Sequence, residues 1–350
     1  MLKGISGRTW VSIITVAFLA LVLYLARHEI EKAYNLLDQV NLWILLLLIP
    51  LQFVSYYAAG EMIFAYLKRQ KHIKNISNLT LPRLALEMNF VNHVLPSGGV
   101  SGISYMGWRL KHYGVSASRS TAAQLVRMVS AFLSFGILLL LAIVLMAIDG
   151  NINRWVVGSS IGLVVIMGGA MLLVMYLLNH KERVGGFARR LTSLVNTTVR
   201  LATFGRVGPV MKEDAIRAFF EEVRDDYTFI RKNLRVLVVP FLWGLVFNVV
   251  EVAMFYVSFL ALGHPVNPAP LVIAYGLAGL AGFFMVTPGG AGAYEAIMVA
   301  FLTVAGIPPG IALLAILLTR VLLMLGTIAA GYLFYQQAIL THGKQPVTRV

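Results

Sequence analysis

The sequence contains no cysteine and few charged residues. Without cysteine among its 350 residues, it cannot form disulfides, thiolate metal sites or a cysteine nucleophile. Only 13% of the residues are charged, against roughly 25% in soluble domains. Apolar residues make up 59% and recur in runs long enough to cross a bilayer core of about 30 Å. The composition therefore predicts one continuous all-α polytopic membrane protein.

The sequence also lacks the motifs of common enzymes. We find no Ser-His-Asp arrangement, no phosphate-binding loop and no dinucleotide fingerprint. The glycine-rich run 98–102 follows an apolar arm and not a β-strand, which argues against a nucleotide site. We therefore expect no enzymatic activity, no cofactor and no metal. The alternative of an enzyme that modifies lipids inside the bilayer would have to use Glu87, His93 and Glu295.

Acidic residues are scarce, with 15 against 29 basic residues and a net charge of +14. The basic residues are concentrated in five segments: the N-terminus, 68–83, 109–119, 180–235 and the C-terminus. This asymmetry follows the positive-inside rule and argues against nucleic-acid binding. It predicts a multi-pass protein of the cytoplasmic (inner or plasma) membrane, with both termini in the cytoplasm.

Six apolar runs are long enough to be full transmembrane helices. We place them at about 10–26, 42–67, 121–148, 155–179, 236–262 and 310–338. The first run is interpreted as a retained helix and not a cleaved signal peptide. The polar region 180–235 has apolar residues at helical spacing. This spacing predicts amphipathic helices at the inner surface, with a solvated helical linker as the alternative.

Two further apolar segments are interrupted by proline and glycine. Segment 84–108 has basic residues at both flanks, and its first arm of about twelve residues reaches only about 18 Å. It therefore predicts a re-entrant hairpin that enters from the cytoplasm. Segment 271–306 has no basic residue at either flank, which predicts entry from outside. Its longer arms leave open a pair of true crossings.

The chain contains an internal repeat of a span, a broken hairpin and another span. Glu61, the first break and Arg127 recur at nearly equal spacing as Glu251, the second break and Arg320. The two copies run in opposite directions, as in the inverted repeats of secondary transporters. The predicted divisions are 1–41 (first helix and outer link), 42–148 (repeat 1), 149–235 (span plus amphipathic region), 236–340 (repeat 2) and 341–350 (cytoplasmic tail).

Charged residues within apolar segments are the main functional candidates. They are Glu61, Glu87, Arg127, Glu251, Glu295 and Arg320. Each costs about 2.5–3.5 kcal/mol at the centre of a span unless it is paired or hydrated. We expect Arg127 and Arg320 to bind an anionic headgroup, because a guanidinium suits phosphate. The glutamates would orient the arginines, or bind a cationic group or a coupling proton. Alternatively, Glu–Arg pairs only hold helices together.

The two breaks are the second set of candidates. Glycine permits an unwound backbone, and the helix that follows presents free N–H groups to an anion. The glycines that would let a headgroup approach are Gly98, Gly99, Gly289, Gly290 and Gly292. Asn92 and His93 precede the first break and would line a polar cavity. The alternative is a simple kink or close helix packing.

Residues 87–127 and 283–320 resemble the membrane part of lysylphosphatidylglycerol synthases, a flippase-like family. The similarity lies in Asn92-His93-Val-Leu-Pro-Ser-Gly-Gly-Val-Ser-Gly102 with Arg127, and in Thr287-Pro-Gly-Gly-Ala-Gly-Ala-Tyr-Glu295 with Arg320. The resemblance implies a module that translocates an aminoacylated or related polar lipid. Many members have an acidic residue shortly after the first glycines, where this sequence has Ile103-Ser104-Tyr105.

The resemblance and the charges together predict a lipid flippase or scramblase. Its partners would be membrane lipids and, because the sequence contains no soluble transferase domain, a separate lipid synthase. The sequence leaves open whether the protein forms a homo-oligomer. A non-transporting subunit that anchors or regulates a synthase through 180–235 is the alternative from another functional class.

Overall fold

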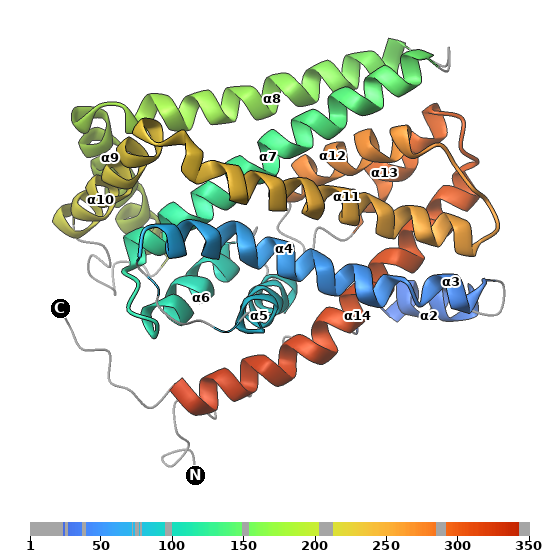
Figure 1. Cartoon of the computed structure of the whole chain (residues 1–350), viewed down its shortest axis with the longest axis horizontal. Helices are drawn as coiled ribbons and strands as arrows, with labels where there is room; N and C mark the ends of the chain where they lie inside the picture. The colour runs from blue at the N-terminus through green and yellow to red at the C-terminus, as the bar shows by residue number, and fades with distance from the viewer. Residues whose placement is uncertain are drawn as a thin grey trace.

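The computed structural model describes residues 24, 27–36, 40–71, 73, 77, 79–94, 100–148, 154–202, 213–284 and 292–342. Within these residues every regular element is a helix. Figure 1 shows long helices lying alongside one another with shorter helices between them. The protein is an all-α polytopic membrane protein, as the composition predicts.

Five helical stretches in the described residues are long and apolar enough to cross a membrane. They are Leu42–Arg69, formed by α3 (Leu42–Leu45) and α4 (Leu48–Arg69); α7 (Ala117–Ile148); Gly158–Leu178 within α8 (Arg154–Leu178); Leu234–Ala261, formed by η2 (Leu234–Leu237) and α11 (Val238–Ala261); and Pro309–Thr341 within α14 (Pro309–His342). Helices suit this setting because they satisfy their own backbone hydrogen bonds. These stretches confirm five of the predicted spans. The predicted span at 10–26 lies outside the described residues, apart from Tyr24.

Helices α4 and α11 pack against each other in opposite directions. At one end, the backbone N–H of Asn41 donates to the carbonyl oxygen of Ala261 at 2.8 Å. At the other end, Leu67 and Val236 belong to one buried cluster. This antiparallel pair joins the two halves of the chain, 42–148 and 236–340 (Figure 1).

The first broken segment forms α5 (Thr80–Val94) and α6 (Val100–Lys111). Leu81 near the start of α5 and Leu110 near the end of α6 share the buried cluster of Leu67 and Val236. Both outer ends of this hairpin therefore lie where α4 ends and α11 begins. We call this the basic end of the bundle, because it also holds Lys68 and Arg69. With 15 residues, α5 is about 22 Å long, which is shorter than a bilayer core.

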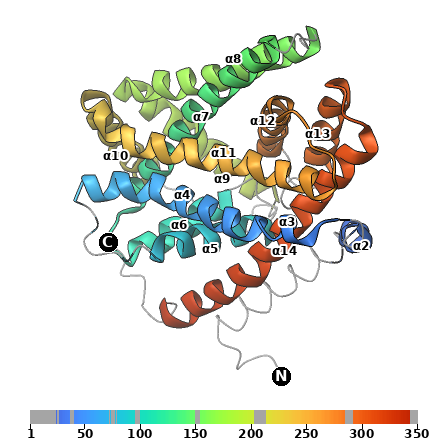
Figure 2. The same cartoon turned by 45° about the vertical axis from the view of Figure 1, so that its right-hand side comes forward.

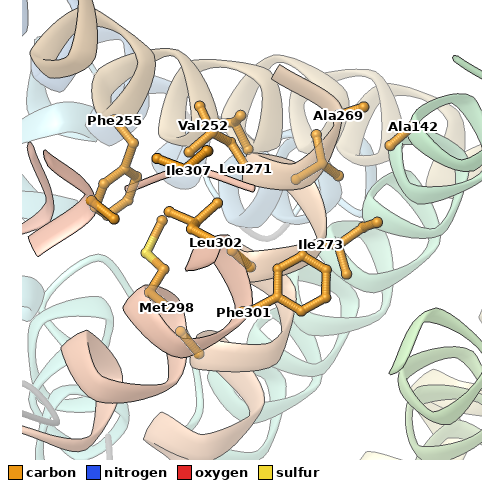
Figure 3. Packing of buried hydrophobic residues seen from close by; sticks show 14 of the residues in the cluster. Ala142, Val252, Phe255, Ala269, Leu271, Ile273, Met298, Phe301, Leu302 and Ile307 are labelled. Carbon is orange, nitrogen blue, oxygen red and sulfur yellow. The ribbon is translucent and has the colours of Figure 1, made fainter. Parts of the chain in front are cut away.

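The second broken segment forms α12 (Pro268–Phe284) and α13 (Ala293–Val304). Figure 3 shows Leu271 of α12 and Ile307, just after α13, packed beside Val252 and Phe255 of α11. Both outer ends of this hairpin therefore lie at the end opposite the basic end. The 12 residues of α13 reach only about 18 Å, which favours a hairpin that enters and returns over a pair of crossings.

Each hairpin packs on the last long helix of the other half. Helix α5 contacts α14, and α12 contacts α7. Glycine permits both contacts, because a Cβ at Gly331 of α14 would collide with Phe90 of α5, and one at Gly276 of α12 would collide with Phe135 of α7. The two halves therefore exchange equivalent contacts, as expected of a repeat.

Two amphipathic helices cover the basic end. They are α9 (Lys181–Ala202) and α10 (Glu213–Lys232), both labelled in Figures 1 and 2. They pack on each other, with the ring centroids of Phe187 and Phe220 at 5.3 Å. Val223 of α10 is buried against Leu178 at the end of α8. The described parts of the region 180–235 are thus mainly helical, as their spacing predicts. Segment 27–41, expected as a polar link, instead contains α2 (Arg27–Leu36).

Candidate functional site

The carboxylate of Glu87 is fully buried between α5 and α6. Its Oε2 accepts hydrogen bonds from Arg109 Nε at 2.7 Å and from the Tyr105 hydroxyl at 2.9 Å, and its Oε1 accepts one from Arg83 Nε at 2.9 Å. Arg109 is only 2% exposed, although the sequence places it in the cytoplasmic flank. Buried charges are tolerated when they are paired in this way. Glu87 is thus neutralised within its own hairpin.

The polar residues before the first break tie the two arms together. Asn92 Oδ1 accepts the backbone N–H of Gly102 at 2.8 Å, which satisfies a free amide in the first turn of α6. A Cβ at Gly102 would collide with the Asn92 side chain. His93 Nδ1 is 2.9 Å from the carbonyl oxygen of Asn89. Asn92 therefore closes the hairpin, in addition to any role as cavity lining.

Arg127 on α7 lies beside the start of α6. Gln124 Nε2 donates to the carbonyl oxygen of Ile103 at 3.1 Å, and Gly107 faces Ser120, so α6 and α7 are antiparallel. One turn farther along α7, this register brings Arg127 level with the first turn of α6. The Nε of Arg127 is buried and has no hydrogen-bond partner in the described part of the chain.

No acidic side chain in the described part of the chain forms an ion pair with Arg127. The sequence explains the absence: when Gly98-Gly99 is aligned with Gly289-Gly290, Ser104 stands where Glu295 stands in the second copy. A guanidinium with a buried Nε and no counter-charge among the described residues is energetically costly.

Arg320 on α14 does have such a counter-charge. Its Nη1 donates to Glu295 Oε1 at 2.6 Å, and its guanidinium lies 4.3 Å from the centroid of the Tyr294 ring. The other oxygen of Glu295 accepts the backbone N–H of Gly292 at 2.7 Å. Gly292 has φ +89°, a conformation that glycine adopts without strain. Glu295 therefore caps α13 and holds Arg320 at the same time.

The two repeat-related glutamates differ. Glu61 Oε1 lies 3.5 Å from Lys68 Nζ on the same helix, toward the basic end. Glu251 Oε1 accepts a hydrogen bond from the Ser55 hydroxyl of α4 at 2.5 Å. Among the described residues Glu251 has no basic partner, so the matched positions have different electrostatic surroundings.

The fold brings part of the predicted set together. His93 of α5 lies within electrostatic range of Arg320, and Tyr294 lies within range of both Arg320 and Glu251. Arg127 is separate from this group. Asn248 of α11 donates to the carbonyl oxygen of Ala131 on α7, and these two helices run parallel. From that contact Arg127 lies toward the basic end of the bundle and Glu251 toward the opposite end. Gly98, Gly99, Gly289 and Gly290 lie outside the described residues.

Sequence reasoning missed several residues of these networks. They are Ser55, Arg83, Tyr105, Arg109 and Tyr294. One signal was present for Tyr294, which is adjacent to Glu295 in the second motif. Tyr105 and Arg109 are four residues apart and therefore share one face of a helix. Within the described ranges no group of three or more His, Asp or Glu side chains could hold a metal ion.

Comparison with known proteins agrees with this architecture. The family described as the lysylphosphatidylglycerol synthase TM region matches residues 10–331. A "UPF0104 membrane protein" of Methanothermobacter thermautotrophicus is 24% identical over 318 residues, which is 90% of this chain and 90% of that protein. No solved structure matches. The chain belongs to the family of lysylphosphatidylglycerol synthase transmembrane regions.

Proposed function

We propose that this protein is a flippase or scramblase that moves a polar-headed lipid, anionic or zwitterionic, across the cytoplasmic membrane. Aminoacylated phospholipid is one candidate substrate. Membership of a membrane family named after a lipid synthase supports a role in lipid handling. The two hairpins at opposite ends of the bundle favour transport, because transporters with inverted repeats bind substrate where broken helices meet.

The observation on which the proposal depends most is Arg127. Its guanidinium lies in a predicted span, beside the first turn of a half-length helix, with a buried Nε that has no partner among the described residues. The start of α6 adds backbone N–H groups and a favourable dipole. A phosphate or carboxylate headgroup would satisfy both the arginine and the helix terminus.

Arg320 would form the second anion position. Because Glu295 and Tyr294 already engage its guanidinium, a headgroup arriving there has to compete with the Glu295 carboxylate. The Arg127 and Arg320 positions are therefore expected to differ in their affinity for an anion. We propose that a headgroup passes between them as the two halves rearrange, either down its gradient or coupled to an ion.

The charge distribution supports one orientation of the protein in the membrane. Lys68 and Arg69 end α4, and α9 and α10 add further basic residues at the same end. By the positive-inside rule we propose that this basic end faces the cytoplasm. On this orientation the α5–α6 hairpin is re-entrant from the cytoplasm and the α12–α13 hairpin from outside, and both chain termini are cytoplasmic.

Proteoliposomes test the proposal. The purified protein would be reconstituted with trace fluorescent anionic or zwitterionic lipid, and the lipid accessible from outside would be followed by chemical quenching. The proposal predicts protein-dependent exchange between leaflets that is greatly reduced in Arg127→Ala, with unchanged thermal unfolding, and in Arg320→Ala, whose thermal unfolding is measured alongside because the Arg320–Glu295 pair is lost. Full transport by both variants would show that neither arginine binds the headgroup.

A non-transporting role is the second candidate, favoured by one observation. The α9–α10 pair presents charged groups such as the Arg217–Glu221 ion pair, and both side chains keep substantial exposure. Such a surface could hold a synthase at the membrane. Co-purification of a synthase together with no lipid movement in proteoliposomes would favour this role, and chemical conversion of the added lipid would instead indicate an enzyme.

A further inference from the structure

Glu251 is a carboxyl group in the interior of a predicted membrane span. It is in the middle of α11, where that helix crosses α4. The side chain is only partly exposed, and its Oε1 accepts the Ser55 hydroxyl at 2.5 Å. A charged carboxylate at such depth costs several kcal/mol, on the order of 2.5–3.5, unless it is paired or hydrated.

The other three glutamates in the hairpins and spans are paired. Glu87 has Arg83 and Arg109, Glu295 has Arg320, and Glu61 has Lys68. Within the described residues Glu251 has no Lys, Arg or His within ion-pair distance. It is therefore the one acid of this group whose charge the described part of the protein does not neutralise.

The hydroxyl of Ser55 on α4 is hydrogen-bonded to Glu251. Tyr56 of α4, Tyr275 of α12 and Tyr294 of α13 lie within electrostatic range of the same carboxyl group. Tyr56 is itself hydrogen-bonded to Gln52 and Thr327. Among the described residues, the arginines of the neighbouring helices do not pair with Glu251. Arg320 of α14 is held by Glu295, and Arg127 of α7 lies toward the basic end.

This environment suits a proton better than a metal ion. A hydroxyl can donate to a carboxylate or accept from a carboxylic acid, so the site can satisfy both states. Bound cations such as Ca²⁺ or Mg²⁺ take six or more oxygen ligands, usually with more than one carboxylate. Within the described residues no three His, Asp or Glu side chains are grouped to hold a metal ion, and Glu295, which shares the neighbour Tyr294 with Glu251, is already paired with Arg320.

We propose that Glu251 binds and releases a proton during the transport cycle and thereby couples lipid movement to a transmembrane pH gradient. A hydronium ion on one side transfers its proton to the carboxylate oxygen, so that a hydronium O–H bond breaks, water is left and the neutral acid forms. The acid later returns the proton to a water molecule on the other side, which re-forms hydronium there and the carboxylate here. This inference rests on the proposed transport function.

Glu251 lies where the two halves of the chain meet, so binding of a proton there can change how the halves pack. Helices α4 and α11 form the contact between the two halves, so gain or loss of charge there changes the energy of that interface. Tyr294 connects Glu251 to the second anion position. Its ring stacks at a centroid distance of 6.3 Å on Phe255, which is one helical turn after Glu251 on α11, and the Arg320 guanidinium lies over the same ring. Protonation would therefore alter the field at both the interface and Arg320.

Infrared difference spectroscopy tests the proton site without requiring transport. The full-length protein in lipid would be titrated with acid while the C=O stretch of protonated carboxylic acids is recorded. The inference predicts a titrating band that is absent from Glu251→Gln and retained in Glu221→Gln, the same change at the exposed Arg217–Glu221 pair. Ser55→Ala should keep the band but shift its frequency, because the carboxyl loses its hydrogen-bond partner.

The coupling is tested in proteoliposomes with an imposed pH gradient. Wild type and Glu221→Gln should move lipid several-fold faster with the gradient than without it, and Glu251→Gln should lose this difference. An unchanged infrared band in Glu251→Gln, suppression of the band by Na⁺ at constant pH, or a gradient effect that survives in Glu251→Gln would each overturn the inference. If wild type moves no lipid at all, the proposed transport function fails, while the infrared band still decides whether Glu251 binds a proton.

Discussion

At the scale of single residues, the arginines are distinguished by their partners. Arg109 and Arg320 each have a buried or partly buried glutamate within 2.7 Å, whereas Arg127 has none among the described residues. A paired arginine stabilises the fold, and an unpaired arginine is available for a ligand. The same residue type therefore has different expected roles at these positions.

Arg127→Ala should weaken lipid movement without unfolding the protein. Loss of a hydrogen bond to a charged group costs about 1.5–3 kcal/mol, which corresponds to a roughly tenfold to hundredfold lower affinity for the headgroup. The initial rate of lipid exchange in proteoliposomes at limiting substrate measures this loss. Arg217→Ala, on the exposed face of α10, serves as the control and should exchange lipid at the wild-type rate.

Arg109→Ala should have the opposite profile and destabilise the fold. It leaves the buried Glu87 carboxylate with one ion-pair partner, the more exposed Arg83, and breaking a buried pair costs about 3–5 kcal/mol. Thermal unfolding in detergent measures the effect. Arg83→Ala is the matched control, because its side chain is 28% exposed and its loss should cost less. Equal shifts in Tm for the two variants would contradict the difference in burial.

At the scale of elements, glycine permits the close approach of the hairpin arms. Gly102 of α6 faces Asn92 of α5, which accepts its backbone N–H. The close approach of the arms near the first break thus uses this hydrogen bond and the absence of a methyl group at position 102, in addition to the hydrogen bonds that Glu87 accepts from α6 farther along the hairpin. The second hairpin instead uses Glu295 to cap α13.

Gly102→Ala should destabilise the protein by about 1–3 kcal/mol, the usual cost of overpacking. The new Cβ would overlap the Asn92 side chain and force the arms apart. Gly136→Ala on α7 is the control, because nothing lies within 4 Å of its added Cβ and alanine favours the helix by about 0.5–1 kcal/mol. The order of the two unfolding temperatures checks the prediction, and a Gly102→Ala variant as stable as wild type would contradict the tight packing.

The helices themselves were predictable from the sequence, and their side-chain partners were not. Long apolar runs and Pro-Gly breaks mark α4, α7, α11 and α14 and both hairpins, because each signal is local. The pair of Glu87 and Arg109 joins residues 22 positions apart and depends on how the hairpin closes. Arg109 also resembles an ordinary flanking charge in the sequence. The hydrogen bond from Ser55 to Glu251 joins the two halves, and no local pattern announces it.

At the scale of the whole molecule, the two halves exchange contacts. Helix α5 packs on α14 and α12 on α7, while α4 and α11 cross as an antiparallel pair. A movement of one half relative to the other would therefore change both hairpin environments together. This arrangement suits alternating exposure of a shared interior to the two sides.

The absence of cysteine allows the orientation of the hairpins to be measured directly. Single cysteines at Ser77 and Lys111 flank the first hairpin, and single cysteines at His264 and Thr303 flank the second; all four positions are exposed. Labelling with a membrane-impermeant thiol reagent in oriented vesicles should mark the first two from the cytoplasm and the other two from outside. Labelling of Ser77→Cys and Lys111→Cys from different sides would contradict a re-entrant first hairpin.

A density map of the protein in lipid nanodiscs tests most directly whether the bundle interior binds a lipid headgroup. We predict headgroup density inside the bundle, against the Arg127 guanidinium and the first turn of α6, with its acyl chains leading out between helices. Lipid density confined to the outer surface, with Arg127 engaged by a protein carboxylate, would contradict the proposed transport site.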